Sequence, residues 1–252
     1  PLRVRERLAE RPDHLEELVS LHGGEPVGAR PTRLHDELHR PGPAAPARGL
    51  VDREVAPQQE LPPFGHLDRE ELTRARLLGD LARVFAAGAI KAPDSESALR
   101  FNKLAEETIV VERNLHENYG KRWNMTAKQM TSVPMAPTNY AYTRHMLAVA
   151  AAGTAAEITA VALPCAWVYC VIGQHLLKKG PPAKHHPYRD WLMLYASPEF
   201  AEVQEWMRRK VDQWAKTAGK EEKRRMEESF VISSRYEWMF WEMAWNEEEW
   251  PV

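Results

Sequence analysis

The sequence predicts an all-α protein, a bundle of about seven or eight helices. From residue 68 to the end of the chain, apolar residues recur every three or four positions, which is the spacing of one buried helix face. No stretch of useful length alternates between apolar and polar residues, as a half-buried strand would. Prolines, glycines and capping residues divide the chain at intervals that suit separate helices.

The composition excludes several broad classes of protein. Of 252 residues, 44% are hydrophobic and 28% charged, and the formal net charge is −2, so no overall field favours nucleic acid. No apolar run approaches the ~18 residues of a membrane helix, because Thr154, Glu157 and Thr159 interrupt the best candidate. The sequence does not start with a hydrophobic stretch of signal-peptide type. Cys165 and Cys170 diverge in angle on one predicted helix, so we expect free thiols and a reduced, cytoplasmic protein.

The chain changes character near residue 65. Residues 1–64 hold 10 of the 19 prolines and one aromatic residue, Phe64, whereas all 9 tryptophans and all 7 tyrosines follow. Such a segment buries little apolar surface, so we expect it to be poorly structured, apart from one short helix over residues 4–22. Residues 65–252 are expected to form the helical domain.

The first two helices of this domain are expected over residues 68–90 and from about residue 95 to beyond residue 115. Asp68 is the expected N-cap of the first helix, and the sequence Ala92-Pro93-Asp94 ends it. Ser95 or Ser97 is expected to cap the second. Their apolar positions include Leu72, Leu77, Leu78, Leu81, Phe85, Phe101, Leu104, Ile109 and Leu115.

The remaining helices follow from local start and stop signals. Thr138 is expected to cap a helix that runs to about residue 152, where Gly153 breaks it. Thr154 then opens the helix that carries both cysteines. A short helix over 188–195 follows a Gly/Pro loop, and Ser197, with proline at the first turn, begins a helix that runs to about residue 218. The last helix is expected over residues 221–246.

The segment Leu163-Pro164-Cys165-Ala166-Trp167-Val168-Tyr169 places a cysteine beside a proline in a strongly helical stretch. A proline inside a helix removes one backbone donor and clashes with the preceding turn, which costs about 3 kcal/mol or more. We therefore expect Cys165 to lie at a local kink, with Tyr169 one turn later on the same face. A helix that keeps such a defect beside a thiol is a candidate for chemistry, although a buried cysteine is most often a small hydrophobe.

Glu237 lies in the almost wholly apolar run between Phe230 and Trp241, and no basic residue follows at i+3 or i+4. A buried carboxylate is unfavourable unless it is paired or protonated. We expect desolvation to raise its pKa, which suits a group that accepts and donates protons near neutral pH. The adjacent Tyr236 is expected to face elsewhere.

Other candidates for chemistry are weaker. His185 and His186 form a loop pair without matching ligands, so we expect no metal site. The chain has no P-loop, GxGxxG or GxSxG motif, and we expect no cofactor. A metal-dependent oxygenase would need carboxylates and histidines on facing helices. Glu107, Glu112 and His116 supply part of such a set, but no histidine follows Glu237 at i+3.

Four stretches, taken in order, resemble the TenA family, the thiaminase II or aminopyrimidine aminohydrolases of thiamin salvage. The resemblance covers roughly residues 65–250 and implies a haem-oxygenase-like helical bundle that binds no haem. It also implies a homotetramer that deaminates aminomethyl-aminopyrimidine to the hydroxymethyl pyrimidine and cleaves thiamin more slowly. The small-molecule partner would be an aminopyrimidine or thiamin, with no nucleic acid and no membrane. The matching stretches are residues 137–146, 156–169, 186–195 and 230–241.

The resemblance implies a role for each matching residue. Cys165 matches the nucleophilic cysteine that attacks the electrophilic carbon of a 4-aminopyrimidine, and Glu237 matches the glutamate that shuttles protons. Tyr142 matches a tyrosine that forms hydrogen bonds within the same site. The residues implied to line the pyrimidine pocket are Tyr169, Tyr195 and Phe240. The residues alone, without the resemblance, favour the interpretation of Tyr142 and Tyr169 as core tyrosines with satisfied hydroxyls.

This sequence departs from the family's pattern at the residues that bind the pyrimidine from the N-terminal helix. The family has an Asp and a Tyr on an N-terminal helix, and the Asp grips the amino group and a ring nitrogen of the pyrimidine. Anchored on residues 81–85 and 91–94, the comparison places Arg74 and Leu77 at these positions, and the nearby Asp80 falls about two turns too late. If residues 67–72 are matched to the start of the family's helix instead, about five residues are missing in between. A divergent member that lost this anchor would fit, as would a first ~75 residues altered by a reading-frame error. The alternative function is a non-catalytic or weakened protein that binds pyrimidine or thiamin.

Overall fold

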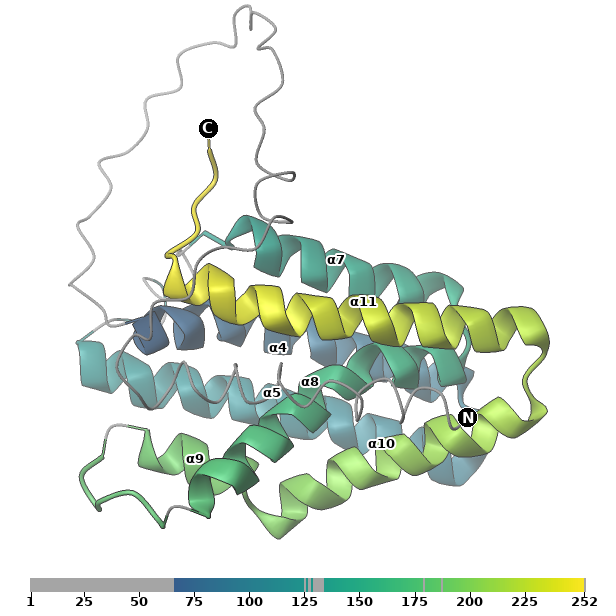
Figure 1. Cartoon of the computed structure of the whole chain (residues 1–252), viewed down its shortest axis with the longest axis horizontal. Helices are drawn as coiled ribbons and strands as arrows, with labels where there is room; N and C mark the ends of the chain where they lie inside the picture. The colour runs from purple at the N-terminus through teal and green to yellow at the C-terminus, as the bar shows by residue number, and fades with distance from the viewer. Residues whose placement is uncertain are drawn as a thin grey trace, which may run out of the picture. The chain divides into compact units, whose positions relative to one another are not determined.

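The computed structural model describes residues 66–124, 126, 128, 134–178, 180–186 and 188–251, and these ranges contain helices and no strand (Figure 1). Side chains are described from residue 76 onward, apart from several positions late in α5. The all-α prediction is confirmed, whereas residues 1–64 and the helix expected within them lie outside the described residues. The helices are α4 (His66–Lys91), α5 (Ser95–Trp123), α7 (Pro137–Ala152), α8 (Ala155–Leu177), α9 (Arg189–Tyr195), α10 (Pro198–Thr217) and α11 (Lys220–Trp245).

Helix α8 is the central element, in contact with α4, α7, α9, α10 and α11. Every residue from Ala155 to Cys165 is buried, which explains why this helix is apolar all round rather than amphipathic. The expectation that no stretch has the length of a membrane helix was wrong, because α8 is long and apolar enough. Within its most apolar window, however, 83% of the residues are buried inside the protein, as in a core helix.

Helix α11 runs antiparallel to α7, and polar contacts join α11 to α7 and to the residue that precedes α8 at successive levels along the bundle. Thr138 at the start of α7 binds Glu248, just after the end of α11, through its backbone N–H (2.9 Å) and its hydroxyl (3.1 Å). At the other end, Thr154 Oγ1 donates to Glu222 Oε1 at 2.7 Å. Tyr142 and Glu237 meet between these two levels. The antiparallel register therefore brings the middle of α7 against the middle of α11.

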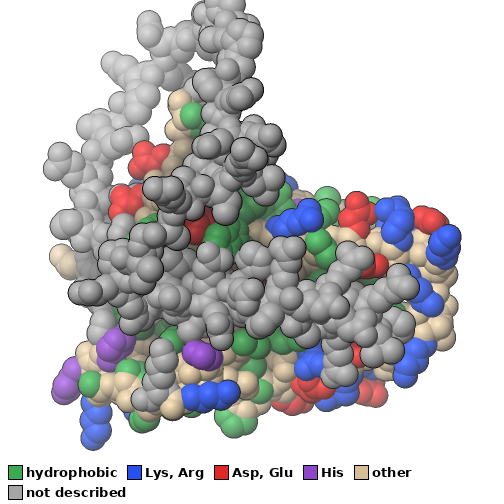
Figure 2. Space-filling view, viewed as in Figure 1, with side chains coloured by type: hydrophobic (Ala, Val, Ile, Leu, Met, Phe, Trp, Pro, Cys, Tyr) green, Lys and Arg blue, Asp and Glu red, His purple; other side chains and the backbone are tan. Residues whose placement is uncertain are grey.

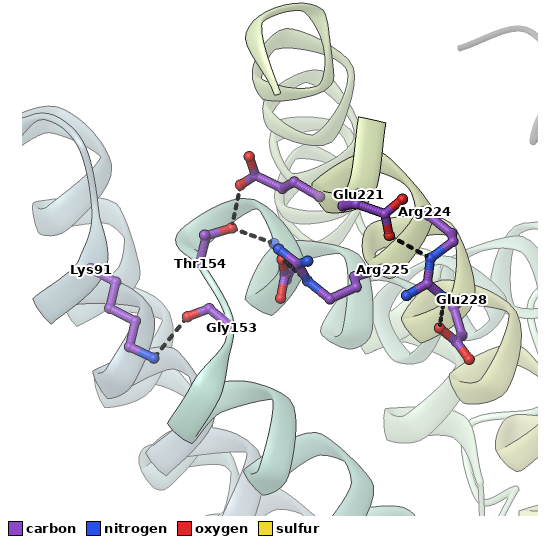
Figure 3. Close-up of polar contacts among 9 residues, drawn as sticks. Lys91, Gly153, Thr154, Glu221, Arg224, Arg225 and Glu228 are labelled. Atoms are coloured by element: carbon purple, nitrogen blue, oxygen red, sulfur yellow. Dashed lines mark hydrogen bonds and ion pairs between the residues drawn. The ribbon is translucent and has the colours of Figure 1, made fainter. Parts of the chain in front are cut away.

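The junction between α7 and α8 fixes the position of α8, the helix that carries both cysteines. Lys91, the last residue of α4, donates from Nζ to the carbonyls of Ala150, Ala151 and Gly153, which closes the C-terminal end of α7 (Figure 3). Gly153 is required by close approach, since a Cβ there would lie 2.8 Å from the backbone oxygen of Val149. These contacts tie α4, α7 and α8 together at one end of the bundle.

Charged side chains of both signs gather at the same end of the bundle, where α10 leads into α11 (Figure 2). Arg224 pairs with Glu221 at 3.0 Å and with Glu228 at 2.9 Å, all three on the exposed start of α11 (Figure 3). Arg225 Nε reaches across to Glu157 Oε1 of α8 at 2.9 Å. The exposed pairs contribute little to stability, but the last one joins α11 to the buried α8.

Two of the predicted helix caps are confirmed. Thr154 accepts from the Glu157 N–H, and Ser197 accepts from the Phe200 N–H. Three expected caps were wrong: α4 already begins at His66, Asp94 caps α5 by accepting from Ser97, and Thr138 lies within α7. Thr138 instead binds a carboxylate 110 residues away, a contact that no local pattern reveals.

Candidate active site

The centre of the candidate site is a hydrogen bond between α7 and α11. Tyr142 Oη donates to Glu237 Oε1 at 2.5 Å, a length typical of a hydroxyl bound to an ionised carboxylate. Tyr142 is fully buried, and Glu237 is 2% exposed. A tyrosine hydroxyl that is fully screened from water therefore holds the carboxylate at this point in the core.

Cys165 of α8 belongs to the same site. Burial raises the pKa of Tyr142 well above its usual value, and the negative charges of Glu237 and then Cys165 raise it further. The hydroxyl of Tyr142 therefore keeps its proton and remains a donor to Glu237. Cys165 is buried on α8 and acts electrostatically on Tyr142, so its thiol lies in the neighbourhood of the Tyr142–Glu237 pair.

The backbone beside Cys165 is helical on both sides of the proline. The α8 helix runs without interruption from Ala155 to Leu177, so the defect at Pro164 does not end it. Pro164 has no N–H to donate to the carbonyl of Ala160, one turn earlier. The missing bond falls in the turn that precedes the thiol, where every neighbouring residue of α8 is buried.

An aromatic cluster continues from the site toward α9. The ring of Tyr169, one turn after Cys165, lies 5.1 Å from that of Tyr195 and 5.6 Å from that of Trp241. Trp191 completes the cluster, 4.9 Å from Tyr195. Tyr169 also acts electrostatically on Tyr142, so the cluster adjoins the Tyr142–Glu237 pair. The structure thus brings together five of the six predicted site residues: Cys165, Glu237, Tyr142, Tyr169 and Tyr195.

Phe240 and Gly173 also shape this part of the protein. Phe240 is 1% exposed and lies on α11 three residues after Glu237, so the two share the buried face of that helix. Gly173 allows α9 to approach α8, because a Cβ there would lie 2.7 Å from the carbonyl carbon of Tyr195. A larger residue at position 173 would push Tyr195 away from Tyr169.

Tyr236 was misplaced by sequence reasoning. Its ring stacks on that of Tyr142, with centroids 5.2 Å apart and an interplanar angle of 15°. The ring of His145, one turn along α7, lies 5.8 Å from Tyr236 on the outer side. Desolvation lowers the pKa of His145, so this half-buried ring is favoured in its neutral form. A helical wheel points Tyr236 away from Glu237, and only the register with α7 shows that its ring stacks on that of Tyr142.

Three residues that sequence reasoning missed carry buried polar atoms without a hydrogen-bond partner among the described residues: Ser233 Oγ, Trp191 Nε1 and Gln204 Oε1. Ser233 lies one turn before Glu237 on the same face of α11. Leaving a buried polar group unsatisfied costs about 1–3 kcal/mol. The only sequence signal for Ser233 is its place in the stretch that carries Glu237.

Leu77 and Arg74 are the residues that the sequence comparison predicts at the positions of the family's pyrimidine anchor. Leu77 of α4 is 3% exposed and packs in the core, while the side chain of Arg74 lies outside the described residues. Asp80 is engaged elsewhere, since its carboxylate accepts from Arg83 at 2.7 Å and from Arg144 at 2.5 Å. Asp80 is therefore no substitute for the missing carboxylate.

The weaker candidates stay apart from this centre. His185 and His186 are exposed on the loop before α9, and Glu107 pairs with Lys103 on the surface of α5. The described residues contain no group of three or more His, Cys, Asp or Glu side chains arranged to hold a metal ion. A surface cavity between α8, α10 and α11 lies against Trp167 and Phe230 and is lined by none of the predicted site residues.

Comparison with known proteins identifies the family. Residues 75–247 match the TENA/THI-4/PQQC family. The chain is 41% identical over 172 residues to a protein of Halalkalibacterium halodurans named aminopyrimidine aminohydrolase, a match that covers 68% of this chain and 76% of the relative. A Bacillus subtilis protein of the same name is 34% identical over 173 residues, which cover 69% of this chain and 72% of the relative.

Solved structures agree with this assignment. The TenA homologue from P. horikoshii OT3 superimposes with a TM-score of 0.60 at 29% identity, over 72% of this chain and 83% of that one. A TenA family protein from Silicibacter sp. TM1040 superimposes with a TM-score of 0.64 at 19% identity, over 72% and 82% of the two chains, and supports the fold alone. The chain therefore belongs to the TENA/THI-4/PQQC family and has the haem-oxygenase-like helical fold of its TenA relatives.

Proposed function

We propose that this chain is an aminopyrimidine aminohydrolase, a thiaminase II of thiamin salvage, with Cys165 as its nucleophile. The observation that carries the proposal is the buried Tyr142–Glu237 hydrogen bond with Cys165 beside it. A thiol, a carboxylate and a neutral phenol are together in a core that is otherwise largely apolar. The names of the relatives from H. halodurans and B. subtilis support the same activity. We place this activity in the helical domain expected from residue 65 onward.

The proposed reaction exchanges an amino group for a hydroxyl. The Cys165 sulfur gives up its proton to Glu237 and forms a bond to an electron-poor carbon of the pyrimidine ring. Electrons displaced through the ring expel the aminomethyl nitrogen, which takes the proton from Glu237 and leaves as ammonia. Water then adds its hydroxyl to the exocyclic carbon and its proton to Glu237. The carbon–sulfur bond then breaks and releases the hydroxymethyl pyrimidine, and the Cys165 thiolate takes the proton back from Glu237, which restores both groups.

In this reaction Glu237 acts in turn as a base and as an acid, and the hydrogen bond from Tyr142 holds its carboxylate in place. A carboxylate that changes its protonation state needs a partner that keeps its own proton throughout. Tyr142 meets this requirement, because burial and the neighbouring charges raise its pKa well above the working range. The 2.5 Å hydrogen bond also fixes the orientation of the carboxylate toward the centre of the site.

The aromatic residues supply the surface for a planar ring. We propose that Tyr169 and Tyr195, together with Phe240, line the pocket that binds the pyrimidine. Aromatic side chains bind such rings through offset or edge contacts at the separations found between Tyr169 and Tyr195. Trp241 packs against Tyr169 and Trp191 packs against Tyr195, so the two tryptophans support the rings that we propose to contact the pyrimidine.

A second candidate function follows from the anchor positions. Leu77, buried in the core where the family has a tyrosine, offers no polar atom to a pyrimidine, and the family's Asp position holds Arg74. A chain with this departure would bind pyrimidine or thiamin through the aromatic cluster and turn it over slowly or not at all. Calorimetry that detects binding, with no ammonia released over hours, would favour this second candidate.

The test of the first candidate is ammonia release from 4-amino-5-aminomethyl-2-methylpyrimidine and cleavage of thiamin by the purified full chain. We expect one ammonia for each hydroxymethyl pyrimidine formed, with the aminopyrimidine as the faster substrate. Glu237→Gln keeps the size of the side chain and its ability to accept from Tyr142 but removes the proton shuttle, so we expect turnover to be lost. Glu228→Gln, on the exposed side of α11, is the matched control and is expected to stay active. Full activity of Glu237→Gln would exclude the proposed role of the carboxylate.

We also propose that the chain acts in the cytoplasm as a homotetramer, as the family resemblance implies. Exposed aromatic and apolar residues support a contact between subunits near the end of α11: Met239, Trp245 and Trp250 are 43%, 55% and 50% exposed. Light scattering on a sizing column tests the assembly, and a monomer at micromolar concentration would contradict it.

A further inference from the structure

Ser233 is a buried hydroxyl that the proposed mechanism does not use. It is fully buried on α11, and its Oγ has no hydrogen-bond partner among the described residues. A serine inside a helix has an easy alternative, which is to donate to the carbonyl four residues earlier. Its neighbour Ser234 does this, donating to Phe230 O at 2.8 Å.

A histidine ring lies near the carbonyl that Ser233 would use. This acceptor is Ser229 O, and His145 Nε2 of α7 lies 3.5 Å from it. In α8, by contrast, the buried hydroxyl of Thr159 donates to its own i−4 carbonyl at 2.8 Å. Ser233 is thus a hydroxyl held in the core without the partner that the helix normally provides.

The position of Ser233 relative to Glu237 points to its use. Residues four apart on a helix lie on the same face, and a side chain leans over the turn that precedes it. The Glu237 side chain therefore extends toward the level of Ser233, and one carboxylate oxygen is bound by Tyr142. A group that receives a proton from Glu237 has to lie next to this carboxylate, within reach of the Ser233 hydroxyl.

We propose that Ser233 Oγ accepts a hydrogen bond from the amino group that leaves the substrate, and so favours aminomethyl pyrimidines over thiamin. This inference rests on the proposed function. A hydroxyl oxygen with free lone pairs complements an amine, which brings hydrogens and needs acceptors. The leaving nitrogen of thiamin belongs to a thiazolium ring and has no hydrogen to donate. The hydrogen bond is therefore available to one substrate and absent for the other.

The test compares Ser233→Ala with Ser234→Ala, its neighbour whose hydroxyl stays within the helix. For Ser233→Ala we expect kcat/KM for 4-amino-5-aminomethyl-2-methylpyrimidine to fall about tenfold, while kcat/KM for thiamin stays within about twofold. Ser234→Ala should leave the ratio of the two unchanged. Because no hydrogen bond within the protein is lost, the urea midpoint of Ser233→Ala should equal or exceed that of the wild type.

Binding provides a readout that does not need turnover. In a Cys165→Ser background, Ser233→Ala should weaken calorimetric binding of the aminomethyl pyrimidine but not of 4-amino-2,5-dimethylpyrimidine, which lacks the leaving amine. An equal fall for both substrates, or no fall for either, would overturn the role of Ser233 and leave the proposed function standing. A wild-type chain that neither binds nor converts these pyrimidines would overturn the proposed function, and the role of Ser233 with it.

Discussion

Replacing Tyr142 with phenylalanine removes a single oxygen from a fully buried side chain and, with it, the 2.5 Å hydrogen bond to Glu237. The ring remains, and so does its stack on Tyr236. A hydrogen bond to a charged partner contributes about 1.5–3 kcal/mol. We therefore expect the free energy of unfolding at pH 7 to fall by about 2 kcal/mol. The same change at Tyr236, which is only half-buried, should cost less than about 0.5 kcal/mol.

Urea unfolding of Tyr142→Phe, Glu237→Gln and the double variant measures the pair directly. Because the two side chains are in contact, their effects should not add, and we expect an interaction energy of about 1 kcal/mol or more. If the losses in unfolding free energy of the two single variants add to that of the double variant within about 0.5 kcal/mol, Tyr142 does not hold the carboxylate. The proposal that Tyr142 orients Glu237 for proton transfer would then be refuted.

Three further predictions concern stability. Lys91→Met removes the donor to three carbonyls at the end of α7 and should lower the free energy of unfolding by about 1–2 kcal/mol in urea, whereas Lys216→Met on exposed α10 should not. Gly153→Ala should cost about 2 kcal/mol because its Cβ would lie 2.8 Å from the backbone oxygen of Val149, whereas Gly219→Ala, with nothing within 4 Å, should change stability by less than about 0.5 kcal/mol. Tyr142 has a pKa near 10 in the unfolded chain and a raised one in the folded protein, so its contribution is complete below about pH 10 and is lost as the pH rises further. The wild type should therefore lose stability above pH 10 by up to about 1.4 kcal/mol per pH unit more than Tyr142→Phe does.

Helix identities were predictable because their signals are local. Thr154 and Ser197 cap the helices that they precede, and the glycine and proline signals around them mark the breaks. The start of α7 was harder to predict, because its first turn is completed by Glu248, which lies 110 residues further along the chain. Likewise α8 is apolar all round, so its periodicity does not reveal which face carries Cys165.

The grouping of the site residues could be predicted from family resemblance and not from periodicity. Cys165, Glu237 and Tyr142 are far apart in the sequence, and only the register of three helices brings them together. The stack of Tyr236 on Tyr142 depends on the same register and was missed for that reason. Ser233 was missed because its significance lies in a hydrogen bond that it does not make.

The most direct test of the account is the rate of ammonia release by Cys165→Ser beside Cys170→Ser. Both thiols are buried in α8, five residues apart, so the two variants differ in chemistry rather than in the kind of substitution. We predict that Cys165→Ser loses turnover by at least about a thousandfold while its urea midpoint stays close to that of the wild type. Cys170→Ser should retain turnover. Comparable rates in the wild type and Cys165→Ser would contradict the nucleophile and, with it, the central claim.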